Sequence, residues 1–155
     1  MTIAFRKLFS SFFILALAIA SIATASAEDG YRLWLRYDPI DDAALRSLYV
    51  KLASRIVIQP SSPTLEVARD ELVEGLHGLL GEKVSVETQS LPNASAVIVV
   101  TPETQPSLVQ QLGSELRAVG AEGYLLKTLH HSNGTPQIVI AANHDIGALY
   151  GVFAF

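Results

Sequence analysis

The sequence contains no cysteine among its 155 residues. This absence excludes disulfide bonds, thiol catalysis and cysteine-based metal sites. Phosphate-binding glycine loops are absent as well, because neither a G-x-G-x-x-G nor a Walker pattern occurs. Gly120 and Gly123 only flank Ala121 and Glu122. The sequence therefore provides no support for nucleotide binding, and we expect no cofactor.

Basic residues are scarce: 11 lysines and arginines stand against 15 aspartates and glutamates, for a net charge of −4. Two of the basic residues, Arg6 and Lys7, lie in an N-terminal segment that we expect to be removed, whereas every acidic residue follows it. The remaining chain then carries 9 basic and 15 acidic residues, a net charge of −6. An acidic surface argues against nucleic acid and against anionic lipid as partners.

The N-terminal segment, residues 1–27, has the three parts of a signal peptide. Arg6 and Lys7 precede an almost wholly apolar run at 9–20, and the small residues 25–27 fit a cleavage site. A membrane-spanning helix needs about 20 consecutive apolar residues, and serines and a threonine crowd this run at both ends. We therefore expect export, to the periplasm or the outside of the cell, with no membrane contact after cleavage.

The residues after the signal, 28–155, read as a single small α/β domain. Apolar runs with β-branched and aromatic residues predict a mixed sheet of about five or six strands with helices packed on it. The predicted strands are 31–37, 55–58, 84–86, 96–100, 123–129 and 137–141, the last two forming a hairpin. The run at 96–100 is continuously apolar, which is typical of a strand buried on both faces.

Four helices are expected between and after these strands. Asp41 or Asp42 can cap the first, which carries Leu45, Leu48, Tyr49 and Leu52 on one face. Ser62 and Pro63 suit the start of the second and Gly81 its end. The third is expected at 107–119, weakened by Gly113. Asn143 or Asp145 can cap a last helix from about Ile146. That helix is apolar to the last residue, so we expect that more protein originally followed.

Candidate catalytic groups all have simpler structural interpretations. Asp38, Asp41 and Asp42 form an acidic cluster, but helix capping accounts for them. The adjacent His130 and His131 point to opposite faces of a strand, so a shared metal ion is not expected.

The other two histidines are treated in the same way. His77 fits a partly exposed position on its helix. His144 and Asp145 stand where a helix start needs a cap or an acidic first turn.

Two Asn-x-Ser/Thr sequons occur in expected turns, at Asn93-Ala94-Ser95 and Asn133-Gly134-Thr135. They matter only if the host glycosylates secreted proteins.

Both ends of the domain resemble one family. The decapeptide at 28–37 (Glu-Asp-Gly-Tyr-Arg-Leu-Trp-Leu-Arg-Tyr) resembles the mature start of the α-glucuronidases of glycoside hydrolase family 67. The segments at 122–124, 138–143 and 147–153 (Gly-Ala-Leu-Tyr-Gly-Val-Phe) are similar to the end of that family's N-terminal domain. Ile146 departs from the pattern, because many relatives have a basic residue there. The resemblance spans essentially all of 28–155.

This resemblance implies a parent enzyme with an inverting mechanism that removes 4-O-methyl-glucuronic acid, or glucuronic acid, from xylan-derived oligosaccharides. Its catalytic carboxylates would lie in a (β/α)₈ barrel, which needs about 250 residues. Only 128 residues of the 155 remain after the signal. No catalytic residue is therefore carried over, and we expect none here. We expect the missing barrel to pack against the last helix, through Leu149, Tyr150, Val152 and Phe153.

Two alternatives stay open. The chain could be a stand-alone carbohydrate-binding module in which Tyr31, Trp34 and Tyr37 stack on sugar, although covering the sheet is the simpler role for these rings. It could also be the N-terminal domain of a β-N-acetylhexosaminidase-type enzyme, whose closing pattern is similar.

The signal peptide gives the first testable prediction. N-terminal sequencing of the exported protein should begin near Glu28, because the small residues just before it form the cleavage site. An exported protein that retains Met1 would contradict the interpretation.

Overall fold

The computed structural model describes residues 36–89, 93–130 and 132–155, and the chain divides into two compact units, Met1–Arg36 and Tyr37–Phe155. The predicted signal peptide and most of the strand predicted at 31–37 lie outside the described residues. Arg36 and Tyr37, the described end of that predicted strand, are not in a strand. The helices and strands given below all belong to the second unit.

Five strands form one mixed sheet in the order β2-β1-β3-β5-β4. Their bounds are β1 Arg55–Val57, β2 Ser85–Glu87, β3 Ala96–Val100, β4 Tyr124–His130 and β5 Pro136–Ala142. All neighbouring pairs are parallel except β4 and β5, which form the predicted antiparallel hairpin. The expected mixed sheet and its strand number are confirmed.

The central strand β3 is buried along its whole length, as its continuous apolar run predicted. Successive side chains of a strand point to opposite faces, so Val97 and Val99 enter one core while Ile98 and Val100 enter another. The sheet is therefore covered on both sides.

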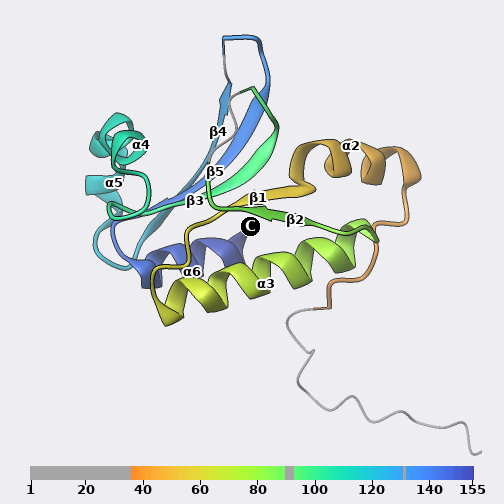
Figure 1. Cartoon of the computed structure of the whole chain (residues 1–155), viewed down its shortest axis with the longest axis horizontal. Helices are drawn as coiled ribbons and strands as arrows, with labels where there is room; N and C mark the ends of the chain where they lie inside the picture. The colour runs from red at the N-terminus through yellow and green to blue at the C-terminus, as the bar shows by residue number, and fades with distance from the viewer. Residues whose placement is uncertain (1–35, 90–92, 131) are drawn as a thin grey trace, which may run out of the picture. The chain divides into compact units, whose positions relative to one another are not determined.

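Helices supply the two covers (Figure 1). On one face α3, Pro63–Leu80, lies beside α6, Asp145–Ala154. On the other face are two short helices, α4 Pro106–Gln111 and α5 Gly113–Val119. The single helix predicted at 107–119 is thus wrong: it breaks at buried Leu112, just before Gly113, a poor helix former.

The first described helix, α2 Ala43–Ala53, begins as predicted at Asp42. The Asp42 carboxylate accepts hydrogen bonds from the backbone N–H groups of Ala44 and Leu45, at 2.8 and 3.0 Å. Of the residues predicted to share one face of this helix, Leu45, Leu48 and Tyr49 are exposed, and α2 meets the core through other residues, chiefly Ala53.

The caps of α3 match the sequence prediction. Ser62 accepts a hydrogen bond from the Leu65 N–H at 3.2 Å, and Pro63 occupies the first turn. Gly81 ends the helix with φ +69°, a left-handed conformation that favours glycine. The long helix α3 is therefore fixed at both ends by local sequence.

The segment that enters α2 is held against α3 by backbone contact. The Ile40 N–H donates to the Leu79 carbonyl at 3.0 Å. A Cβ added at Gly78 would lie 2.5 Å from the Tyr37 carbonyl oxygen, and one added at Gly75 would lie 2.9 Å from the Tyr37 ring. These two glycines let the chain run directly over the helix.

Gly78→Ala should therefore destabilise the domain by about 1–3 kcal/mol, the usual cost of overpacking, although alanine is the better helix former. Urea denaturation measures the change. The matched control is Gly113→Ala, whose added Cβ meets nothing closer than 3.6 Å. The control should be neutral or up to about 1 kcal/mol more stable. Equal stability of Gly78→Ala and the wild type would contradict the contact.

Candidate functional site

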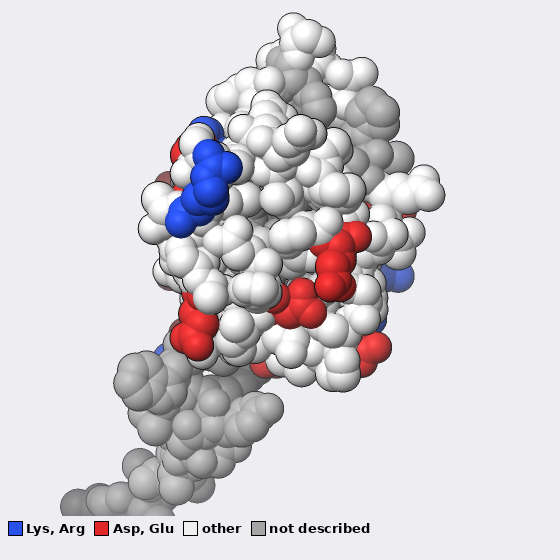
Figure 2. Space-filling view, turned by 90° about the vertical axis from the view of Figure 1, so that its left-hand side faces the viewer, with Lys and Arg blue, Asp and Glu red and all other residues white. Residues whose placement is uncertain are grey.

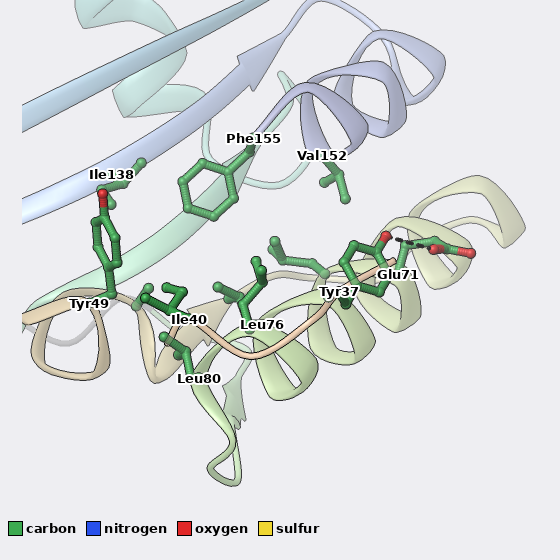
Figure 3. A pocket seen from close by; sticks show the side chains of 13 residues that line it. Tyr37, Ile40, Tyr49, Glu71, Leu76, Leu80, Ile138, Val152 and Phe155 are labelled. Atoms are coloured by element: carbon green, nitrogen blue, oxygen red, sulfur yellow. Dashed lines mark hydrogen bonds between the residues drawn. The ribbon is translucent and has the colours of Figure 1, made fainter. Parts of the chain in front are cut away.

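One pocket lies between α2, α3 and the end of α6, with a volume of about 330 Å³. Tyr49 of α2, Leu76 of α3 and Phe155, beyond the end of α6, project into it (Figure 3). The remaining lining residues are almost all apolar: Tyr37, Ile40, Ala53, Glu71, Leu72, Gly75, Leu79, Leu80, Ile138 and Val152. No pattern in the sequence indicates this pocket, because its walls come from segments that are distant along the chain, such as Tyr37 and Phe155.

The polar groups of this pocket are few. The Tyr37 hydroxyl donates to the Glu71 carboxylate at 3.4 Å (Figure 3). Burial, and then the nearby Glu71 carboxylate, raise the pKa of the Tyr37 hydroxyl above its usual value. Glycoside hydrolysis needs two carboxyl groups flanking the scissile bond, whereas Glu71 is the single carboxylate among the described residues that line this pocket. These residues can hold an apolar group but do not form an acid and base pair.

A second hollow, of about 480 Å³, opens where β3 and β5 end, the edge at which open α/β sheets usually bind ligands. It is lined by Thr101, Pro102, Glu103, Asn143, His144, Asp145 and Ile146.

Several of these polar side chains have structural tasks. The Thr101 N–H donates to the Thr104 hydroxyl at 3.0 Å. The Asn143 amide donates to the carbonyls of Leu116 and Gly120, at 2.7 and 2.8 Å, and so ties the end of β5 to α5. Their hydrogen bonds hold loops in place.

The start of α6 differs from the prediction that Asn143 or Asp145 caps it. The N-cap residue is His144, whose side chain makes no capping bond, and Asp145 stands in the first turn. The Ser62 hydroxyl donates to the Asp145 carboxylate at 2.6 Å while it also caps α3. A single serine thus joins the N-termini of the two helices that cover one face of the sheet, and the positive ends of both helices favour the carboxylate there.

The acidic cluster near the start of the unit forms no part of either hollow. Asp38, Asp41 and Asp42 are exposed, and none of them lines either pocket. Asp42 has the capping role that the sequence predicted.

The histidines lie apart. His77 is exposed in the last turn of α3, with Nδ1 2.9 Å from the Glu82 carbonyl oxygen. His130 is exposed at the end of β4, while His131 is outside the described residues. Among the residues that the structure describes, no group of three or more histidines and acids could hold a metal ion. The expectation that the chain has no catalytic, cofactor or metal residue stays a prediction.

Both sequon asparagines are exposed. Asn93 has φ +64°, and the Asn133 side-chain oxygen accepts a hydrogen bond from the Thr135 N–H at 3.0 Å in the turn between β4 and β5.

The expected docking residues of α6 separate into two groups. Val152 is buried in the domain's own core, and Leu149 is half-buried and packs against that core. Tyr150 and Phe153 are exposed. The prediction is therefore wrong for Val152, because the helix turns that residue toward α3 and the sheet.

On the face that carries α4 and α5, the charged side chains lie apart from one another. Figure 2 shows isolated acidic patches and a basic group there, with uncharged side chains over most of the area between them. The described residues of this face form no continuous basic surface of the kind that binds nucleic acid. In the described part of the chain, no helix combines the length and the apolar character needed to cross a membrane.

Ser62→Ala should lower the free energy of unfolding by about 0.5–2 kcal/mol, since it removes the cap of α3, and it also leaves Asp145 without this donor. Thermal or urea denaturation measures the loss. Ser61→Ala changes the exposed neighbouring serine and should be nearly neutral. If both variants unfold like the wild type, Ser62 does not join the helices.

Comparison with known proteins shows which family this chain resembles. Residues 33–155 match the glycosyl hydrolase family 67 N-terminus. The chain is 36% identical over 149 residues to α-glucuronidase A of Emericella nidulans, covering 92% of this chain and 16% of the relative. It is 31% identical over 139 residues to a probable α-glucuronidase A of Aspergillus oryzae, covering 86% of this chain and 15% of the relative.

The chain thus spans about 16% of the length of the first relative. The match decides against the β-N-acetylhexosaminidase alternative and confirms the resemblance seen in the sequence. The chain belongs to glycosyl hydrolase family 67, and residues 33–155 correspond to the N-terminal part of that family.

Proposed function

We propose that this chain is the N-terminal, non-catalytic part of an exported α-glucuronidase. The observation that carries the proposal is the family match over residues 33–155 together with relatives named α-glucuronidase A. The proposed reaction is hydrolysis of the α-1,2 bond that joins glucuronic acid, or its 4-O-methyl ether, to xylan-derived oligosaccharides, with inversion at the anomeric carbon.

The chemistry of the described residues supports a non-catalytic role. An inverting glycosidase needs one carboxylic acid to protonate the leaving oxygen and one carboxylate to activate water, about 6.5–9.5 Å apart. The pocket beside α3 is lined by one carboxylate among the described residues, Glu71. The hollow at the end of β5 is lined by two carboxylates, Glu103 and Asp145. Glu103 is exposed to solvent, whereas Asp145 accepts a hydrogen bond from the Ser62 hydroxyl and belongs to the first turn of α6. We assign the catalytic pair to a barrel outside this chain.

Export is part of the proposal. The charged start, apolar run and small-residue cleavage site of 1–27 support it, although these residues lie outside the described part of the chain. A polysaccharide-degrading enzyme meets xylan fragments beyond the cytoplasm, in the periplasm or outside the cell.

Among the described residues, no observation favours the binding-module alternative. Tyr31 and Trp34 lie outside the described residues. The Tyr37 ring is packed over Gly75 of α3 and its hydroxyl is bonded to Glu71, so one face of this ring is not free to stack on a sugar.

Domain exchange tests the proposed function. Residues 28–155 of this chain would replace the matched region of the Emericella nidulans α-glucuronidase A. The purified chimera should release glucuronic acid from aldouronic substrates, whereas residues 28–155 alone should release none. The unmodified relative, assayed in parallel, gives the activity with which that of the chimera is compared.

Two results would contradict the proposal. Release of glucuronic acid by residues 28–155 alone would place a catalytic site within this chain. A chimera that is inactive beside an active unmodified relative would show that this domain does not serve an α-glucuronidase.

A further inference from the structure

Helix α6 turns an apolar stripe away from the core of its own domain. Ile146, Tyr150 and Phe153 follow the i, i+4, i+7 spacing that places side chains on one helix face. Their exposed fractions are 37%, 44% and 47%. The opposite side of the helix is buried, with Gly147, Ala148, Gly151 and Val152 against the sheet and α3. The helix is thus apolar on both sides, although only one side has a partner within the domain.

The edge strand β4 continues this stripe. Tyr124 and Leu126 are two residues apart, so they point to the same face of the sheet, and they are 36% and 40% exposed. Their partners in β5 are Ala142 and Ile140, which lie in the core beneath α6. A Cβ added at Gly151 would lie 3.1 Å from the Tyr124 Cβ, so strand and helix are in contact. We call these five residues (Tyr124, Leu126, Ile146, Tyr150 and Phe153) the α6–β4 surface.

The α6–β4 surface has few of the features that normally keep an exposed strand edge from pairing with another chain. Within the described sheet β4 pairs only with β5, so its other edge is open over seven residues. Long edges are normally protected by charged residues, proline or a bulge. The one charged residue of β4 before its final histidine is Lys127, which points to the other face and binds Glu115 of α5 at 2.6 Å. Beyond Asp145, α6 has no charged residue at all.

The apolar face of α2 differs in this respect. Leu45 and Leu48 are exposed to a similar degree, at 40% and 51%. Arg46 and Lys51 lie within the same helix, and Asp42 caps it. Charged residues of this kind are typical of a helix that stays in water, and they make α2 a suitable control.

We propose that the α6–β4 surface is where the rest of the α-glucuronidase polypeptide packs against this domain. The inference rests on the proposed function and deepens it. The relative from Emericella nidulans has about five-sixths of its length outside the match, because this chain covers 16% of it. A contiguous apolar patch with an open strand edge marks an interaction site in a soluble protein. The proposed occupant is an apolar face of the catalytic part, and the test below distinguishes it from a second copy of this chain.

The same chimera provides the test, with Tyr150→Ser and Phe153→Ser combined on α6. The matched control combines Leu45→Ser and Leu48→Ser on α2. A few central residues, often aromatic, carry most of the binding energy of an interface. We therefore expect the α6 variant of the chimera to lose activity on heating at least about tenfold faster than the wild-type chimera, and the α2 variant to resemble the wild type.

A measurement without substitutions guards against a variant that fails to fold. Hydroxyl-radical footprinting would compare the oxidation of Tyr124, Tyr150 and Phe153 in this chain and in the unsubstituted chimera. These side chains should be oxidised in the chain alone and protected in the chimera, whereas Leu48 should react equally in both.

The outcomes separate the two proposals. Equal oxidation of the α6–β4 surface in both proteins, or heat inactivation of an active α6 variant at the wild-type rate, overturns the docking surface and leaves the proposed function standing. An inactive unsubstituted chimera overturns the proposed function, and the docking proposal with it. Association of this chain alone into a stable dimer that protects Tyr150 and Phe153 also overturns the docking proposal, since a second copy would then be the partner.

Discussion

Burial of β3 on both faces is the constraint on which the rest of this domain depends. Five consecutive apolar residues, Ala96–Val100, cannot meet water on either side of a strand without a large loss of hydrophobic stabilisation. Helices must therefore cover both faces of the sheet. The chain supplies α3 and α6 on one side and the short pair α4 and α5 on the other.

In this arrangement the polar groups near the strand ends form hydrogen bonds that hold the helices in place. Asn143 binds two carbonyls of the α5 region, and Ser62 bridges the starts of α3 and α6 through Asp145. These residues line or adjoin the edge where many α/β sheets place a ligand. Here their hydrogen bonds position helices. Under the proposed function, this domain presents a surface to the rest of the polypeptide, and the chemistry belongs to that other part.

The sequence predicted helices and strands well where the deciding interactions join residues that are close together in the chain. Ser62, Pro63 and Gly81 bounded α3 because caps act within a few residues, and the hairpin of β4 and β5 followed from its turn at Asn133 and Gly134. Two predictions of helix bounds failed. The helix at 107–119 is broken at Leu112, just before Gly113, and the sequence indicated only a weakening there. The N-cap of α6 is His144, while Asp145 accepts a hydrogen bond from Ser62, a contact over 83 residues that no local signal indicates.

The sequence by itself determined the class of fold, the central buried strand and the membership of a glycoside hydrolase family, because hydrophobic period, caps and family-typical segments are all written in consecutive residues. It also placed the apolar residues of the last helix. Only the tertiary structure decided which of them are available, turning Val152 into the core and leaving Tyr150 and Phe153 outside. It likewise brought Tyr124 of β4 against Gly151 of α6. The reason is that a helix apolar all round has no preferred inward side until a sheet and a neighbouring helix are packed against it.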